Sequence, residues 1–166
     1  MNLPVANPIV KNVPLDKIIP EKLFLDLYDK KFTGYVYLTI EGKFCFEESI
    51  LILNNGKIDG AIYIIEGYDI ELLGKDAISY CINCFGVTNG RLNIFSLTTD
   101  QIKLILLFND KIKYTLAITK DKNIPGFKNI KYNDILVYNL LKDRIVKNKT
   151  SKDILNDFNL EDLLKE

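Results

Sequence analysis

The sequence predicts an α+β fold, with an antiparallel sheet of about five or six strands, helices packed on it and a C-terminal helical appendage. Residues 35–40 and 43–47 alternate in side-chain character around the Glu41-Gly42 turn, as strands with one buried face do. Asn55-Gly56 separates two apolar runs, and this dipeptide favours a type I′ hairpin because both central residues need positive φ. Residues 75–85 and 133–147 repeat apolar positions with helical spacing.

The first part of the chain predicts an arm, a helix and four strands. Pro4, Pro8 and Pro14 predict an extended N-terminal arm, since proline biases the preceding residue away from the helical region. Pro20 suits the first position of a helix, which we expect over residues 21–30. The four strands are expected at residues 35–40, 43–47, 50–53 and 58–65.

The pattern changes after residue 66. Residues 67–74 are expected to form a transition with a short helical turn, followed by a helix over residues 75–85. Gly86 is expected to end that helix at the usual C′ position. Thr98 and Gln101 have the spacing of a capping box. The remaining expected elements are a strand at 92–96, a helix at 99–108 and a strand at 113–118.

Three segments are expected along the chain. Residues 1–120 are predicted to form the α+β domain with its N-terminal arm and helix, and residues 121–131, which contain Pro125-Gly126, a linker. Residues 132–166 are predicted to be a helical segment, with helices over 133–147 and from Thr150 or Ser151 onward. The last stretch is amphipathic, so we expect it to pack on the domain, on a second copy or on a partner. Its apolar residues are Ile154, Leu155, Phe158, Leu160, Leu163 and Leu164.

The composition argues against several classes of function. A hydrophobic content of 48% is enough for a real core. Lys and Arg total 22 and so do Asp and Glu, so the basic excess of a dedicated nucleic-acid binder is missing. Histidine, the commonest general base and metal ligand, is absent. An odd cysteine count, no signal-like start and no membrane-length apolar run predict a cytoplasmic protein that does not contact the membrane.

Cys81-Ile82-Asn83-Cys84 is a candidate metal or redox motif, with Cys45 as a third ligand. Structural zinc normally takes four nitrogen or sulfur ligands, and a redox Cys-x-x-Cys usually begins a helix. Cys81 instead falls on the apolar stripe of the predicted helix. We therefore expect a buried Cys81, a Cys84 at the margin of the core, and neither metal nor cofactor. A homo-oligomer that pools its cysteines keeps the metal alternative open.

Three carboxylates are further candidates for a functional site. Glu47, Glu48 and Asp59 lie near predicted strand ends and would suit a cation or acid–base chemistry. Adjacent strand residues point to opposite faces, so Glu47 and Glu48 do not converge, and we expect all three to be solvated. Residues 86–91 lack the Lys-Ser/Thr of a phosphate loop and precede a strand, which predicts a helix stop and a turn.

Two further features bear on nucleic acid. Tyr35 and Tyr37 share one strand face and would be able to stack on single-stranded bases, but we expect the N-terminal helix or another subunit to cover them. Residues 142–149 are basic and would be able to touch phosphates, but a solvated helix face is expected. Nucleic acid is therefore not the expected partner.

The central half of the chain carries a family pattern. The pattern consists of Phe32-Thr33-Gly34, then Glu48-x-x-Leu51-x-x-Asn54-Asn55-Gly56-Lys57-Ile58-x-Gly60-Ala61, and then Gly74-x-x-Ala77. It resembles the PATAN-type domain and, more closely, a related archaeal family of unknown function. These turn glycines and apolar positions report fold and not chemistry. The resemblance implies a domain that mediates protein contacts, and it carries over no catalytic residue.

We therefore expect a non-catalytic protein-interaction or regulatory module in a cytoplasmic signalling or assembly complex. Its partner would be another protein or a second copy, bound through the sheet face, the edge of the Ser49–Ile65 hairpin or the C-terminal helices. One alternative is a metal-binding protein or enzyme built on Cys45, Cys81 and Cys84. A second alternative is a nucleic-acid-binding accessory protein with a Lys-rich surface.

Overall fold

The computed structural model describes residues 3–4, 6, 8–116 and 124–148, with only the backbone for 143–148. Internal contacts divide the chain into two units, Met1–Asn133 and Asp134–Glu166. The sheet and three α-helices belong to the first unit, and one α-helix belongs to the described part of the second.

The predicted α+β class is confirmed. Within the described residues the strands are β1 (Pro8–Pro14), β2 (Gly34–Glu41), β3 (Phe46–Asn54), β4 (Lys57–Ile65), β5 (Ile70–Leu73), β6 (Gly90–Ser96) and β7 (Lys113–Leu116). The α-helices are α1 (Pro20–Asp29), α2 (Lys75–Cys84), α3 (Thr99–Phe108) and α4 (Asp134–Asn148). Two single 3-10 turns, η1 (Leu15–Lys17) and η2 (Asp110–Ile112), complete the described elements.

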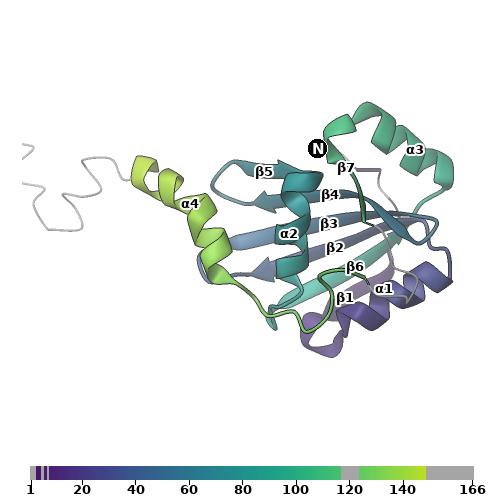
Figure 1. The fold of residues 1–166 in the computed structure, drawn as a ribbon, viewed down its shortest axis with the longest axis horizontal. Coiled ribbons are helices and arrows are strands. Elements are labelled where there is room, and N and C mark those ends of the chain that lie inside the picture. Colours follow the sequence, from purple (N-terminus) through teal and green to yellow (C-terminus); the bar gives the residue numbers. More distant parts are fainter. Residues whose placement is uncertain (1–2, 5, 7, 117–123, 149–166) are drawn as a thin grey trace, which may run out of the picture. The chain divides into compact units, whose positions relative to one another are not determined.

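The strands form one antiparallel sheet in the order β1-β6-β2-β3-β4-β5, with β7 also paired to β4 (Figure 1). The expected arm pairs with β6 as β1, and residues 70–73 form β5 where a helical turn was expected. The two strands expected at 43–47 and 50–53 are one strand, β3. Pairing is unbroken because the polar residues between the apolar runs stay in register, with Ile40 opposite Glu47 and Leu38 opposite Ser49.

Different helices pack on the two faces of the sheet. On one face α2 lies across β3 and β4 (Figure 1). Phe24 of α1 adjoins the end of α2, since its ring centroid lies 5.4 Å from that of Phe85 and 4.3 Å from that of Phe127. On the other face Ile102 and Ile105 of α3 pack into a second cluster. Its remaining buried members are Tyr35, Ile50, Ile52, Ile62, Leu97 and Ile112.

The predicted hairpin between β3 and β4 is present, with φ of 52° at Asn55 and 83° at Gly56. The turn is held against the start of β2, because the Gly56 N–H donates to the Phe32 carbonyl at 2.7 Å. A Cβ at Gly56 would lie 2.7 Å from the Cα of Tyr28. The edge of this hairpin was expected to be open to a partner, and this is wrong. β3 also pairs with β2, and β4 also pairs with β5 and β7.

The helix boundaries follow their end signals with one exception. Pro20 begins α1 as predicted, and Thr98 and Gln101 form both hydrogen bonds of a capping box at the start of α3. The expected left-handed end of α2 at Gly86 is wrong, since Gly86 is not among the glycines with positive φ. A Cβ there would lie 2.3 Å from the backbone nitrogen of Tyr132, so the glycine permits a close chain approach instead.

The segment before α4 belongs to the first unit. Ile124 and Phe127 lie in the expected linker, and each is 1% exposed. They are core residues, as the ring contact of Phe127 with Phe24 illustrates. α4 agrees with the helix predicted over residues 133–147, and the helical segment expected beyond residue 150 lies outside the described residues.

Candidate protein-interaction surface

A buried polar cluster surrounds Glu47 of β3. The Glu47 side chain is 0% exposed and accepts hydrogen bonds from the hydroxyl of Tyr63, at 2.7 Å, and from that of Tyr132. The Cys84 thiol points at the same carboxylate, with 3.8 Å between Sγ and Oε2. Glu47 was expected to be a solvated strand end, and this is wrong. It is buried because the tyrosine hydroxyls supply the donors that a carboxylate needs away from water.

The cluster keeps its phenol and thiol groups protonated. Burial raises the pKa of Tyr63 far above its usual range, and the charge of Glu47 adds to the effect. The same two causes, burial first, raise the pKa of the Cys84 thiol. The thiols and phenols around Glu47 therefore stay protonated at neutral pH, and in that form they are poor nucleophiles. The cluster is suited to holding β3, β4, α2 and the segment at Tyr132 together.

The three candidate cysteines differ in burial. Cys81 is fully buried as predicted, and its thiol donates to the Ile62 carbonyl at 3.2 Å. Burial raises the pKa of Cys81 to about 12. Cys84, expected at the margin, is also 0% exposed. Cys45 is half-buried, and its pKa is raised to about 11 by burial and then by the charge of Glu47. Over the described residues, no three His, Cys, Asp or Glu side chains are grouped to hold a metal ion.

The other candidates are spread over the fold. Glu48 faces away from Glu47, as predicted, and accepts a hydrogen bond from Tyr37 at 2.6 Å. Asp59 accepts from Asn54 Nδ2 at 3.1 Å. Tyr35 is 7% exposed and stacks on Phe95 at 4.6 Å between centroids. The helix in its cluster is α3 and not the N-terminal helix that we expected.

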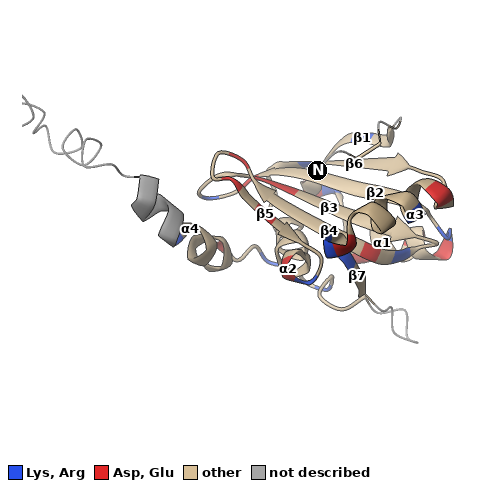
Figure 2. Cartoon of the chain, turned by 90° about the horizontal axis from the view of Figure 1, so that it is seen from above, with Lys and Arg blue, Asp and Glu red and all other residues tan. Residues whose placement is uncertain are grey.

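Residues 86–91 lead from the end of α2 into β6, as the turn prediction required. Of the basic stretch 142–149, the side chains from residue 143 onward lie outside the described residues. Basic and acidic residues are interspersed along the described ribbon (Figure 2). None of the described helices combines the length and apolar character that crossing a membrane requires.

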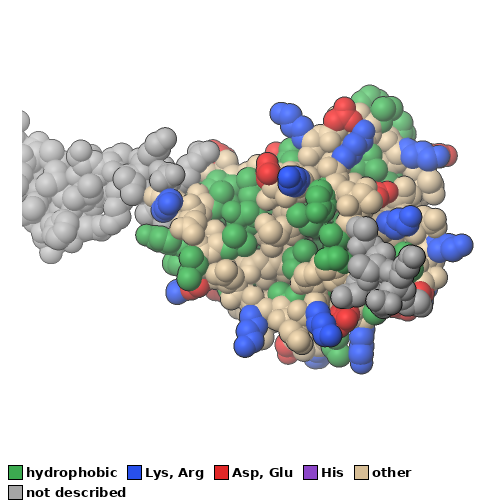
Figure 3. Space-filling view, in the orientation of Figure 1, with side chains coloured by type: hydrophobic (Ala, Val, Ile, Leu, Met, Phe, Trp, Pro, Cys, Tyr) green, Lys and Arg blue, Asp and Glu red, His purple; other side chains and the backbone are tan. Residues whose placement is uncertain are grey.

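The outer side of α3 is the notable surface. Leu104, Leu107 and Phe108 are 52%, 64% and 78% exposed. They lie at positions i, i+3 and i+4, so they form one stripe on the side opposite Ile102 and Ile105. Hydrophobic side chains reach the surface over this helix in the space-filling view (Figure 3). We call Leu104, Leu107 and Phe108 the α3 stripe.

The α3 stripe was not singled out from the sequence, although a signal for it was present. Residues 104–108 are Leu-Ile-Leu-Leu-Phe, five consecutive apolar residues. A helix turns by about 100° per residue, so five such residues occupy every side of it. One side of α3 must therefore face outward with apolar groups, wherever the helix packs.

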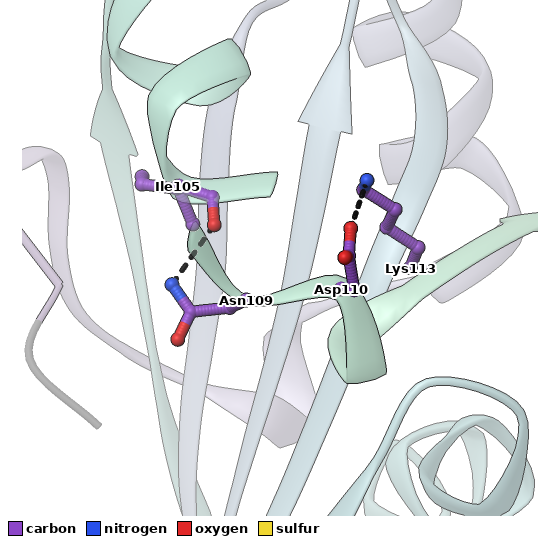
Figure 4. Close-up of polar contacts among 4 residues, drawn as sticks. All are labelled: Ile105, Asn109, Asp110 and Lys113. Atoms are coloured by element: carbon purple, nitrogen blue, oxygen red, sulfur yellow. Dashed lines mark hydrogen bonds and ion pairs between the residues drawn. The ribbon is translucent and has the colours of Figure 1, made fainter. Parts of the chain in front are cut away.

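The C-terminal end of α3 is held in place by local polar contacts. Asn109 Nδ2 donates to the Ile105 carbonyl at 2.9 Å, and Lys113 pairs with Asp110 in the turn that follows (Figure 4). A cavity of about 420 Å³ lies beside this end. Its lining residues are Glu71, Leu73, Phe108, Asn109, Asp110, Lys111 and Ile112. The end of the stripe is thus a fixed, indented surface.

Over the described residues these features define an α+β protein with a single sheet, in which α3 carries apolar side chains on its outer side. The chain belongs to the family described as uncharacterized protein conserved in archaea (DUF2226), whose family model matches residues 1–109. The matched range runs from the N-terminal arm to the end of α3 and so includes the α3 stripe. No curated protein and no solved structure matches the chain.

Proposed function

We propose that the protein is a non-catalytic protein-interaction module whose contact surface is the α3 stripe. The observation that carries this proposal is the exposure of Leu104, Leu107 and Phe108 on a helix that already buries Ile102 and Ile105. A helix that is apolar on all sides is normally buried on all sides. Exposed apolar groups gathered in one place mark contact sites more often than singly scattered ones do.

The sheet edges are less suited to binding a partner strand. The outer edge strand β1 begins with Pro8 and ends with Pro14, and two register shifts interrupt its pairing with β6. At the other side β5 is only four residues long. Prolines, irregular pairing and short length are the usual protections of an edge strand against a further strand. A helix face is therefore the better candidate for a contact surface.

A relation of this chain to PATAN-type domains is part of the proposal. The order that carries the resemblance corresponds to β2, the β3–β4 hairpin and, after β5, the α2 helix that follows Gly74. PATAN-type domains are thought to mediate protein contacts, which agrees with a role without catalysis. A regulatory part in a cytoplasmic signalling or assembly complex is the setting that we propose for it.

A capture experiment with matched variants tests the proposal. The full chain is immobilised, and proteins retained from an extract of its source are compared with those retained by Leu104→Ser/Leu107→Ser. Phe46→Ser is the control, because Phe46 is 56% exposed and begins β3 at the end opposite to the strand ends that lead into α3. We expect the double variant to lose a protein that the wild type and the control retain. Equal retention by all three proteins would refute the α3 stripe as the contact surface.

A further inference from the structure

We propose that residues 124–133 fill a peptide-binding site of this protein, and that an extended segment of a protein partner binds there in their place. We call residues 124–133 the strap. The strap belongs to the first unit and contains neither a helix nor a strand. None of the contacts that hold it, as described below, involves α3. The inference therefore goes beyond the proposed function and does not depend on it.

The first anchor of the strap is Phe127, which is 1% exposed. Its ring centroid lies 4.3 Å from that of Phe24 on α1 and 5.6 Å from that of Phe85, the residue after α2. The neighbouring residues 125, 126, 128 and 129 are exposed. An aromatic side chain that enters a pocket from an exposed stretch is typical of a recognition anchor.

The second anchor is Tyr132, five residues after Phe127. Its hydroxyl donates to the carboxylate of Glu47, which is 0% exposed. A Cβ at Gly42 would lie 2.7 Å from this hydroxyl, so the glycine leaves the space that the tyrosine occupies. A buried carboxylate favours a side chain that carries a hydrogen-bond donor, so this end of the site selects tyrosine over phenylalanine.

Asn83 of α2 recognises the main chain of the strap. It is 6% exposed; its Nδ2 donates to the Asn133 carbonyl at 3.2 Å, and its Oδ1 accepts from the Asn133 N–H at 2.7 Å. Two hydrogen bonds to the main chain of one residue do not depend on the side chain of that residue. Gly86 permits the close approach of the strap at Tyr132. The site therefore suits an extended segment with an aromatic residue and, five residues later, a tyrosine.

The site is formed without the strap. The residues that contact it above lie within residues 1–109, the range that the family model matches, whereas the strap lies outside this range. Among the described elements, no strand pairs with the strap. A cavity of about 340 Å³ also remains beside Phe127, at the start of α1. A segment that is irregular, unpaired to the sheet and incompletely packed is expected to open at a lower free energy than the sheet.

Peptide binding to the full chain tests the proposal. A fluorescently labelled peptide with the sequence of residues 124–133 is followed by fluorescence anisotropy. Phe127→Ala/Tyr132→Ala removes both anchors of the strap, so this variant is expected to bind the peptide at least about tenfold more tightly than the wild type, whose site is already filled. Leu104→Ser/Leu107→Ser, which changes only α3, is the matched control and is expected to bind as weakly as the wild type. A peptide with alanine at both anchor positions is expected not to bind.

Hydrogen exchange of the wild type tests the same proposal without a substitution. The strap amides are expected to exchange at least about 100-fold faster than those of β2, β3 and β4, because the strap opens by itself. Strap amides that exchange only as fast as the sheet would overturn the proposal, since the strap would then open only with the core. Equal peptide binding by the wild type and Phe127→Ala/Tyr132→Ala would overturn it as well, and so would a failure of this variant to fold. The capture experiment on the α3 stripe is independent of these results, because its variants leave the strap unchanged.

Discussion

Replacement of Glu47 by alanine is expected to lower the free energy of unfolding by about 2–5 kcal/mol. The hydroxyl of Tyr63, whose side chain is 0% exposed, loses its acceptor, and a buried unsatisfied hydroxyl costs about 1–3 kcal/mol. Tyr132 is only half-buried and can form a hydrogen bond to water, so the loss of its hydrogen bond to Glu47 costs less. The void left by the shorter side chain accounts for about another 1 kcal/mol. Since small domains have only about 5–15 kcal/mol of stability, the change is large.

Urea unfolding followed by circular dichroism measures this loss. Glu48→Ala is the matched control, because the neighbouring carboxylate is half-buried and accepts one hydrogen bond, from Tyr37. We expect it to cost about 1 kcal/mol or less. Adding Tyr63→Phe to Glu47→Ala removes the orphaned hydroxyl and is expected to restore about 1–2 kcal/mol. The reasoning is refuted if Glu47→Ala costs no more than Glu48→Ala, or if Tyr63→Phe restores nothing in that background.

Four further outcomes are expected. At pH 8 iodoacetamide is expected to alkylate Cys45 about 100-fold more slowly than a free thiol of pKa 9, because a pKa of about 11 leaves little thiolate. An alkylation rate equal to that of free cysteine would contradict this. Burial raises the pKa of Cys81 to about 12, so the protonated thiol favours the folded state. This contribution to the free energy of unfolding is complete below pH 9 and is lost as the pH rises to about 12. Cys81→Ala should therefore raise the midpoint pH of alkaline unfolding. Thr98→Ala removes the capping box and should cost about 1 kcal/mol in urea unfolding. Gly86→Ala forces a Cβ against the chain at Tyr132 and should lower the thermal midpoint more than Thr98→Ala does.

Local signals predicted the elements well where the local chemistry was sufficient. The Asn55-Gly56 turn, the start of α1 at Pro20 and the capping box at Thr98 depend on neighbouring residues alone. The strand count was less accurate. Glu48 and Ser49 were expected to separate two strands, yet they continue β3. The buried Glu47 beside them is held by the hydroxyls of Tyr63 and Tyr132, which are distant in sequence. Such donors have no local signature.

The outer side of α3 was not among the expected contact surfaces. These were the sheet face, the edge of the Ser49–Ile65 hairpin and the C-terminal helices, and neighbouring strands occupy the hairpin edge. The apolar run 104–108 was visible, yet only the fold shows which of its sides is covered. Ile102 and Ile105 turn toward the sheet, and this leaves Leu104, Leu107 and Phe108 outside.

The sequence by itself determined the α+β class, the hairpin and the helix starts, because turn chemistry and periodicity act over a few residues. It also determined that histidine chemistry is absent and that the overall charge is balanced. Only the tertiary structure decided that Glu47 is buried, that Gly86 is needed for a close chain approach, and that α3 presents an apolar side to solvent. Burial is a property of what packs against a residue, and residues distant in sequence, such as Glu47 and Tyr132, meet only when the chain is folded.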